Sequence, residues 1–205
     1  MNKPLDPSHI MQTATAFWPS KVLLTAVELK LFTTLGKNAM NAEQLGAALG
    51  LHPRGTFDFF DTLVALKFLE RDGDGPQGRY KNSPETAMFL DQKSPAYIGG
   101  LPEMLNARLF GFWNHLGTAL KTGKPQNEIS GGGKSMFEEL YADPRRLATF
   151  LDAMTGFQAA NFMQLAEKFN FSKYKTVSDV GGALALLSLP KLISQIAPLS
   201  PHSRR

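Results

Sequence analysis

A strand followed directly by a glycine turn lies near the C-terminal end of this sequence. Residues 175–180 are predicted to form a buried strand, and Gly181 and Gly182 come immediately after it. Glycine at such a turn lets the backbone approach a polar ligand closely, which is typical of the cofactor edge of an α/β sheet. Only 26 residues follow Asp179 in the 205-residue sequence. A doubly wound sheet needs several more strand–helix units, so we expect only the start of such a domain, truncated after its first glycine motif.

Composition excludes several classes of site. Hydrophobic residues make up 43% and charged residues 20% of the chain, as in ordinary globular proteins. The chain has no cysteine, which excludes disulfides, zinc–thiolate sites and thiol nucleophiles. His9, His52, His115 and His202 are scattered without the spacing of metal ligands. We therefore predict no metal site in this sequence.

Charge and hydropathy indicate the compartment and exclude some partners. The net charge of +4 is dispersed along the chain, whereas nucleic-acid binding requires a basic face. The N-terminus lacks the apolar segment of a signal peptide, and no apolar run is long enough to span a bilayer. We expect a soluble, cytoplasmic protein with no nucleic-acid or membrane partner.

The N-terminal third is predicted to be helical with an unusually wide apolar surface. Residues 9–35 carry apolar side chains at helical spacing, and Pro19 should kink this helix or split it in two. The apolar surface exceeds what one intramolecular contact would cover. Either a second chain or the rest of the same domain could cover it, and the pattern does not decide between the two.

Residues 41–82 fit a winged helix, in which a helix-turn-helix is followed by a β-hairpin. The first helix spans 41–51, with Asn41 as its N-cap and Gly50 as its stop, and the second runs from about Pro53 to Leu66. Strands are predicted at 68–71 and 79–82, around a turn rich in Gly and Asp.

The winged helix could bind DNA or could serve as a packing module. The second helix carries Asp58 and Asp61 where a recognition helix would carry basic or amide side chains. This favours a packing module, although a DNA-binding transcription regulator stays as an alternative reading.

The remainder of the chain is predicted to be mainly α-helical. Ser83 and Pro84 should cap and start one helix. Helical segments are expected at residues 95–123, 135–141 and 144–170, followed by a loop at 172–176. The predicted fold class is thus mainly α. A helical dimerisation domain that contains the winged helix is followed in the sequence by the start of a Rossmann-like domain.

Taken in order, these segments resemble the dimeric S-adenosylmethionine-dependent O-methyltransferases of the caffeate and hydroxyindole type. The resemblance covers roughly residues 10–182. It rests on the helix-turn-helix, the wing ending at Ser83, and a few short motifs further along the chain: Trp113–Leu116, Met136–Glu138, Phe150–Met154 and Val177–Gly182. The order and spacing of the segments are more specific than any single motif.

The resemblance implies a homodimer, a methyl donor and an acceptor pocket. Asp179, Gly181 and Gly182 would lie at the methionine end of S-adenosylmethionine. Four residues fall in segments that usually line the pocket for a small aromatic or polyene acceptor: Met104, Trp113, Met154 and Phe157. Each of these four could instead be plain helix core, because methionine and aromatic residues at helical spacing usually are.

The sequence departs from the family pattern after the glycine turn. Positions 183 and 185 are alanine where the motif has glycine, and no second strand with an acidic end and no histidine base follows. We therefore expect three regions: residues 1–95 for dimerisation, 96–172 for the acceptor pocket and linker, and 173–205 for a truncated donor domain with a disordered tail. Such a chain should be inactive in methyl transfer on its own. A non-catalytic helical dimer that binds a small ligand is a further alternative.

Overall fold

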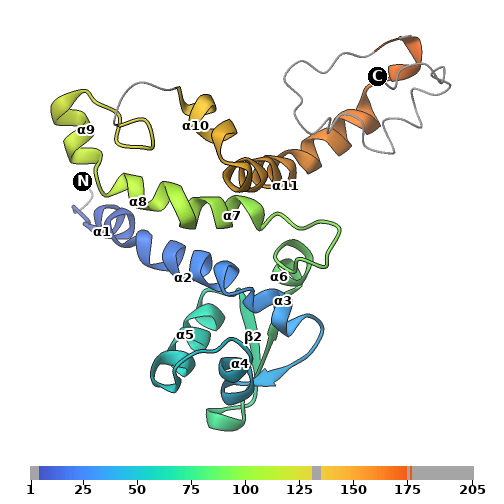
Figure 1. Cartoon of the computed structure of the whole chain (residues 1–205). Helices are drawn as coiled ribbons and strands as arrows, with labels where there is room; N and C mark the ends of the chain where they lie inside the picture. Colours follow the sequence, from blue (N-terminus) through green and yellow to red (C-terminus); the bar gives the residue numbers. More distant parts are fainter. Residues whose placement is uncertain (1–4, 131–134, 175, 177–205) are drawn as a thin grey trace. The chain divides into compact units, whose positions relative to one another are not determined.

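The structure is a computed structural model that describes residues 5–130, 135–174 and 176. The chain divides into two compact units, residues 1–126 and 127–205, and each is described by itself. The described residues are mostly helical, with one small three-stranded sheet in the first unit (Figure 1). This confirms the prediction of a mainly helical chain.

Three helices occupy the predicted N-terminal helical region. They are α1 (Ser8–Thr15), α2 (Phe17–Glu28) and α3 (Leu31–Leu35). The chain leaves the α-helix at Ala16, three residues before Pro19, as expected because a proline ring clashes with the carbonyl group four residues earlier. The predicted split is confirmed. A second break, at Lys30, was not predicted, and this residue adopts a left-handed conformation with φ of 55°.

The two helices expected within residues 41–66 are present as α4 (Ala42–Ala48) and α5 (Pro53–Ala65). Asn41 accepts a hydrogen bond from the Gln44 amide, and the Gln44 side chain accepts one from the Asn41 amide, which makes a capping box. Gly50 has φ of 66°, a left-handed conformation that suits glycine and ends α4.

The expected hairpin consists of β2 (Leu69–Asp72) and β3 (Arg79–Asn82), joined through the short 3-10 helix η1 (Gly75–Gln77). The antiparallel register pairs Leu69 with Asn82. A further strand, β1 (Met40–Asn41), pairs with β3 and gives the sheet order β1-β3-β2. The sequence did not predict β1, since two residues are too few to show an alternating pattern.

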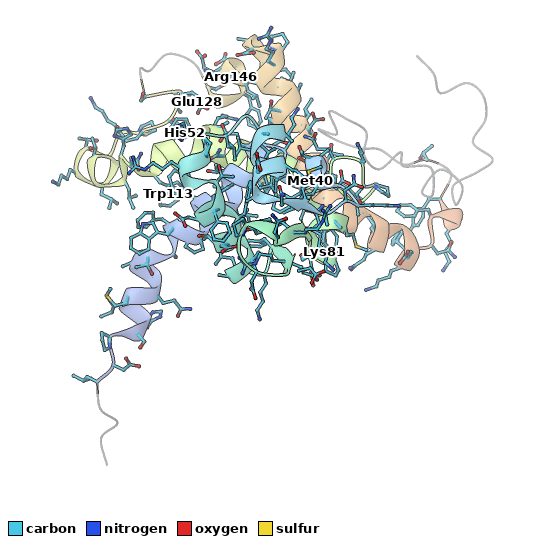
Figure 2. The ribbon with its side chains drawn as sticks, turned by 90° about the horizontal axis from the view of Figure 1, so that it is seen from below. Met40, His52, Lys81, Trp113, Glu128 and Arg146 are labelled. Atoms are coloured by element: carbon cyan, nitrogen blue, oxygen red, sulfur yellow. The ribbon has the colours of Figure 1, made fainter. Side chains whose placement is uncertain are left out.

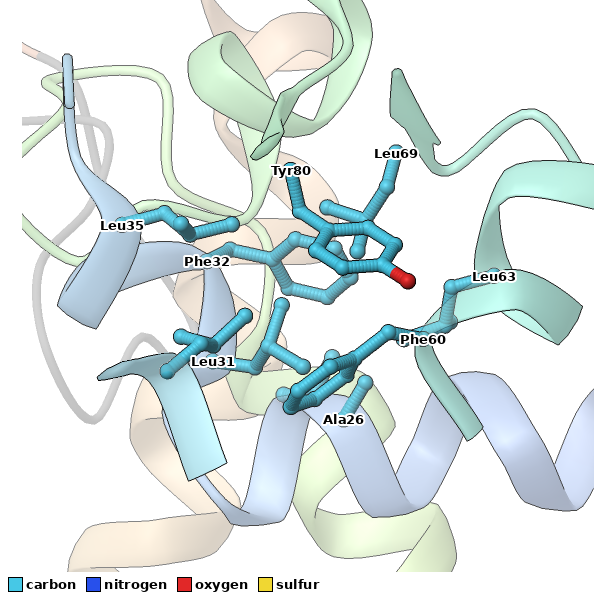
Figure 3. Close-up of a cluster of buried hydrophobic side chains, with 10 residues drawn as sticks. Ala26, Leu31, Phe32, Leu35, Phe60, Leu63, Leu69 and Tyr80 are labelled. Atoms are coloured by element: carbon cyan, nitrogen blue, oxygen red, sulfur yellow. The ribbon is translucent and has the colours of Figure 1, made fainter. Parts of the chain in front are cut away.

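The core of the first unit lies where α2, α3, α4 and α5 meet the sheet. Phe60 and Tyr80 are fully buried, and their ring centroids lie 5.4 Å apart (Figure 3). The other buried members are aliphatic or aromatic side chains from five elements: Ala26, Val27, Leu31, Phe32, Leu35, Leu45, Leu63 and Leu69. This single cluster joins the helices of residues 17–65 to the hairpin.

Helices occupy residues 84–89, 100–113 and 116–122, and the last two ranges correspond to the one or two helices expected at residues 95–123. Ser83 caps α6 (Pro84–Phe89) as predicted. The elements that follow are α7 (Gly100–Met104), the π-helical turn η2 (Leu105–Leu109), α8 (Phe110–Trp113) and α9 (Leu116–Thr122). Helix α7 and η2 pack along α2 (Figure 1).

The predicted helix start at residue 95 is wrong. Segment 91–99 is an irregular connection instead, and hydrogen bonds hold it in place. The Gln92 amide donates to Thr33 Oγ1 over 2.9 Å, and the Tyr97 hydroxyl donates to Glu103 over 2.7 Å. These bonds from other elements replace the backbone bonds of a first helical turn.

The second unit contains α10 (Met136–Ala142) and α11 (Pro144–Lys168), close to the two predicted helices. Ser135 and Asp143 cap them through side-chain hydrogen bonds to backbone amides. The 3-10 helix η3 (Phe171–Lys173) occupies part of the predicted loop at 172–176. The predicted strand from residue 177 lies outside the described residues.

Candidate functional site: an apolar surface on the first two helices

Helices α1 and α2 carry the large exposed apolar side chains that the sequence predicted. Trp18 is 61% exposed and Phe17 51%, and their rings lie 5.3 Å apart. Ile10 and Met11 are also exposed, and none of the residues of α1 is buried. Figure 2 shows the side chains of α1 extending away from the other described helices of this unit. We call these four residues the α1–α2 apolar surface.

A polar network joins α2 to the π-helical turn η2. Lys21 Nζ donates to Asn106 Oδ1, and Asn106 Nδ2 donates to Glu28 Oε2, each over 2.5 Å. The Lys21 ammonium group also lies 4.8 Å from the centre of the Phe110 ring, within the range of a cation–π contact. This network was not predicted from the sequence. The sequence gives one indication of it: Lys21 and Glu28 are seven residues apart, and this spacing places both on one face of a helix.

The residues expected to contact an acceptor differ in exposure. Met104 is buried, with 6% of its surface exposed, whereas Trp113 is 69% exposed at the end of α8. Met154 is half-buried on α11 in the second unit. Phe157 lies in the same helix, but its side chain is outside the described part of the structure. Met104 and Trp113 thus lie in the first unit, on the continuous segment from α7 to α8. Met154 and Phe157 lie on α11 in the second unit.

The residues expected to contact a methyl donor are Asp179, Gly181 and Gly182. All three lie outside the described residues. Their proposed role therefore stays a prediction from the sequence.

A charged network ties helix α5 to the hairpin. Both carboxylate oxygens of Asp61 accept hydrogen bonds from Arg71 Nη1, at 2.6 and 2.7 Å, and Oδ1 also accepts one from the Tyr80 hydroxyl at 2.8 Å. Burial of the Tyr80 ring raises the pKa of its hydroxyl, and the hydrogen bond to Asp61 raises it further. The network holds the hairpin against α5.

The raised pKa of Tyr80 predicts a loss of stability in alkaline solution. An unfolded tyrosine ionises near about pH 10, and the folded protein keeps Tyr80 neutral to higher pH. The stabilisation by neutral Tyr80 is therefore complete below that pH and is lost as the pH rises through the folded pKa. Urea unfolding measured from neutral pH to above pH 10 should show a decline in the free energy of unfolding that is shallower in Tyr80→Phe. An equal decline in both proteins would contradict the prediction.

The described residues carry neither a metal-binding cluster nor a membrane-spanning helix. No group of three or more His, Asp or Glu side chains is placed there so as to hold a metal ion. In the same ranges, no helix combines the length and the low polarity needed to cross a bilayer.

Two family models match consecutive parts of the chain. Residues 11–92 match the O-methyltransferase dimerisation domain, and residues 113–193 match the O-methyltransferase domain. The first match contains most of α1 and all of α2 to α6, and it includes the α1–α2 apolar surface apart from Ile10.

Curated relatives agree with the family models. The chain is 39% identical to the tetracenomycin polyketide synthesis 8-O-methyl transferase TcmO of Streptomyces glaucescens, over 97% of the chain and 55% of that protein. It is 32% identical to the N,N-dimethyltransferase OxyT of Streptomyces rimosus, over 97% of the chain and 56% of that protein. The chain therefore spans about half the length of the curated relatives it matches.

Solved structures share the fold. Human N-acetylserotonin methyltransferase in complex with S-adenosylmethionine matches with a TM-score of 0.81 and 22% identity, over 95% of this chain and 58% of that one. PigF with S-adenosylhomocysteine matches with a TM-score of 0.69 and 26% identity, over 83% of this chain and 50% of that one. With the family models and the curated relatives, these findings show that the chain belongs to the S-adenosylmethionine-dependent O-methyltransferase family.

Proposed function

We propose that this chain supplies the dimerisation and acceptor-covering part of an O-methyltransferase that transfers a methyl group to a hydroxyl of a small aromatic or polyene acceptor. The observation that carries the proposal is the α1–α2 apolar surface, three of whose four residues lie within the match to a dimerisation domain. Large aromatic side chains gathered on one exposed face are typical of protein–protein interfaces. The partner that the family match favours is a second copy of the same chain.

The proposal keeps the three-part organisation expected from the sequence. Residues 1–95 would dimerise, residues 96–172 would cover the acceptor, and residues 173–205 would begin the donor domain. Asp179, Gly181 and Gly182 would contact the methionine end of S-adenosylmethionine, which supplies the methyl group in this family. Met104, Trp113, Met154 and Phe157 are the proposed acceptor-contacting residues.

In this proposal α4, α5 and the hairpin form a winged helix that acts as a packing module. Arg71, the basic residue of β2, is engaged by Asp61 and cannot contact a phosphate without breaking that ion pair. Asp58 is exposed on α5 and would repel a phosphate backbone. These contacts argue against the DNA-binding alternative.

The chain should self-associate through Trp18. Replacing Trp18 with serine removes a large aromatic contact from the α1–α2 apolar surface, so we expect the dissociation constant of the dimer to rise about tenfold. Sedimentation velocity of the 205-residue chain over a range of concentrations measures this directly.

Met88→Ser is the matched control for this test. Met88 is 54% exposed on α6, away from the α1–α2 apolar surface, so its replacement should leave the dimer intact. A wild-type chain that stays monomeric at all concentrations, or an equal weakening by both substitutions, would count against the proposed function.

A further inference from the structure

A cavity of about 530 Å³ lies between α4, α5 and the turn η1 of the hairpin. Pockets that bind small molecules usually have volumes of about 300–1,000 Å³ and mostly apolar walls with a few polar groups. This cavity has that composition, and the residues that matter for its chemistry are Glu43, Ala47, Leu51, Phe57, Pro76 and Gln77. Its size suits a molecule with one or two aromatic rings.

Glu43 is the charged residue among those that line the cavity. Within the described parts of the chain, no hydrogen bond or ion pair engages its carboxylate. Arg71 lies 5.8 Å from the Phe57 ring, but its guanidinium group is already paired with Asp61. The lining of the cavity therefore includes one exposed carboxylate that has no basic partner among the described residues.

The N-terminus of α4 adjoins the cavity and contributes a partial positive charge, opposite in sign to the Glu43 carboxylate. Its partial positive charge is about half an elementary charge and falls off within the first turn. The backbone amides of Asn41 and Gln44 at this end already donate hydrogen bonds to each other's side chains. Glu43, exposed in the first turn of α4, is therefore the side chain that brings a full charge to the lining of the cavity.

We propose that this cavity binds a small apolar organic cation, with its aromatic part against Phe57, Leu51 and Pro76 and its protonated amine at Glu43. The apolar walls would supply affinity by burying the rings, and the single carboxylate would select a cation over a neutral or anionic molecule of the same shape. This site does not depend on the function proposed above.

The test uses the full 205-residue chain and two probes with the same ring system. Naphthylmethylamine is a cation at neutral pH, whereas naphthylmethanol has a similar shape and no charge. We expect the amine to bind more tightly and to shift the backbone amide resonances of residues 42–47 and 75–77 in NMR titrations. Equal affinity for the two probes, no binding of the amine, or shifts confined to other residues would overturn the proposal.

Glu43→Gln isolates the contribution of the charge. This substitution keeps the shape of the side chain and should weaken amine binding about fivefold, as expected for a partly exposed ion pair, without changing the binding of the alcohol. Glu85→Gln is the matched control, because Glu85 occupies the same position in the first turn of α6 and does not line the cavity. If the two substitutions weaken amine binding equally, the charge of Glu43 does not select the ligand.

Ala47→Phe tests the location by filling the cavity. Ala47 is exposed on α4, so a larger side chain should be accepted without unfolding, and circular dichroism checks this. Binding of both probes should be lost. Unchanged binding by a folded Ala47→Phe variant would show that the probes bind elsewhere.

Discussion

Replacing Phe60 with alanine is expected to lower the free energy of unfolding by about 3–5 kcal/mol. Phe60 is fully buried, and its ring packs against Phe59 and Tyr80, with centroids 5.8 and 5.4 Å away. The substitution removes this buried surface and leaves a cavity where α5 meets the sheet. Because Phe60 joins the helices to the hairpin (Figure 3), the loss should affect the whole core of the first unit.

Phe57→Ala is the control for this measurement, since it removes the same side chain from the same helix. Phe57 is 37% exposed and lies outside the core cluster, so we expect a loss of at most about 1 kcal/mol. Urea unfolding followed by circular dichroism measures both variants. Equal losses would mean that the cluster around Phe60 does not hold the first unit together.

The local parts of the fold could be predicted from the sequence because short segments determine them. Asn41 and Ser83 were recognisable as helix caps, and each accepts a hydrogen bond from a backbone amide at the start of a helix. The effect of Pro19 on the first helix was predictable for the same reason, since its ring acts on the residue four positions earlier.

Features that depend on distant residues could not be predicted in this way. Strand β1 forms because its residues pair with β3, some forty positions later in the chain. The irregular segment before α7 is held in part by Thr33, which lies 59 positions before Gln92 in the chain. No local pattern in the sequence records such contacts.

In the candidate site, too, local features could be predicted from the sequence and long-range contacts could not. A wide apolar surface was predictable from the spacing of Ile10, Phe17 and Trp18, because helical periodicity indicates which side chains share a face. The Lys21–Asn106–Glu28 network was not, because Asn106 comes from a π-helical turn that no propensity rule predicts. The role of Asp179 stays a prediction from the sequence, because this residue lies outside the described part of the chain.

Replacing Asn82 with aspartate is expected to lower the free energy of unfolding by about 3 kcal/mol at neutral pH. Asn82 Nδ2 donates to the carbonyl oxygens of Phe32, at 2.8 Å, and Gly36, at 3.0 Å. An aspartate of the same shape has no hydrogen to donate. Both hydrogen bonds would therefore be lost, and a negative charge would lie beside two carbonyl oxygens that have the same sign of partial charge.

Asn38→Asp is the control for charge, because Asn38 is exposed in the loop that follows α3. It adds the same charge without removing the bonds to Phe32 and Gly36, so its effect should be within about 0.5 kcal/mol. Thermal and urea unfolding of both variants at neutral and acidic pH give a second check. The carboxyl group introduced at position 82 should have a raised pKa, since its surroundings disfavour the charged form, and its protonation restores a donor. Its destabilisation relative to the parent protein should therefore diminish as the pH falls, whereas a loss that is independent of pH would indicate a steric cause.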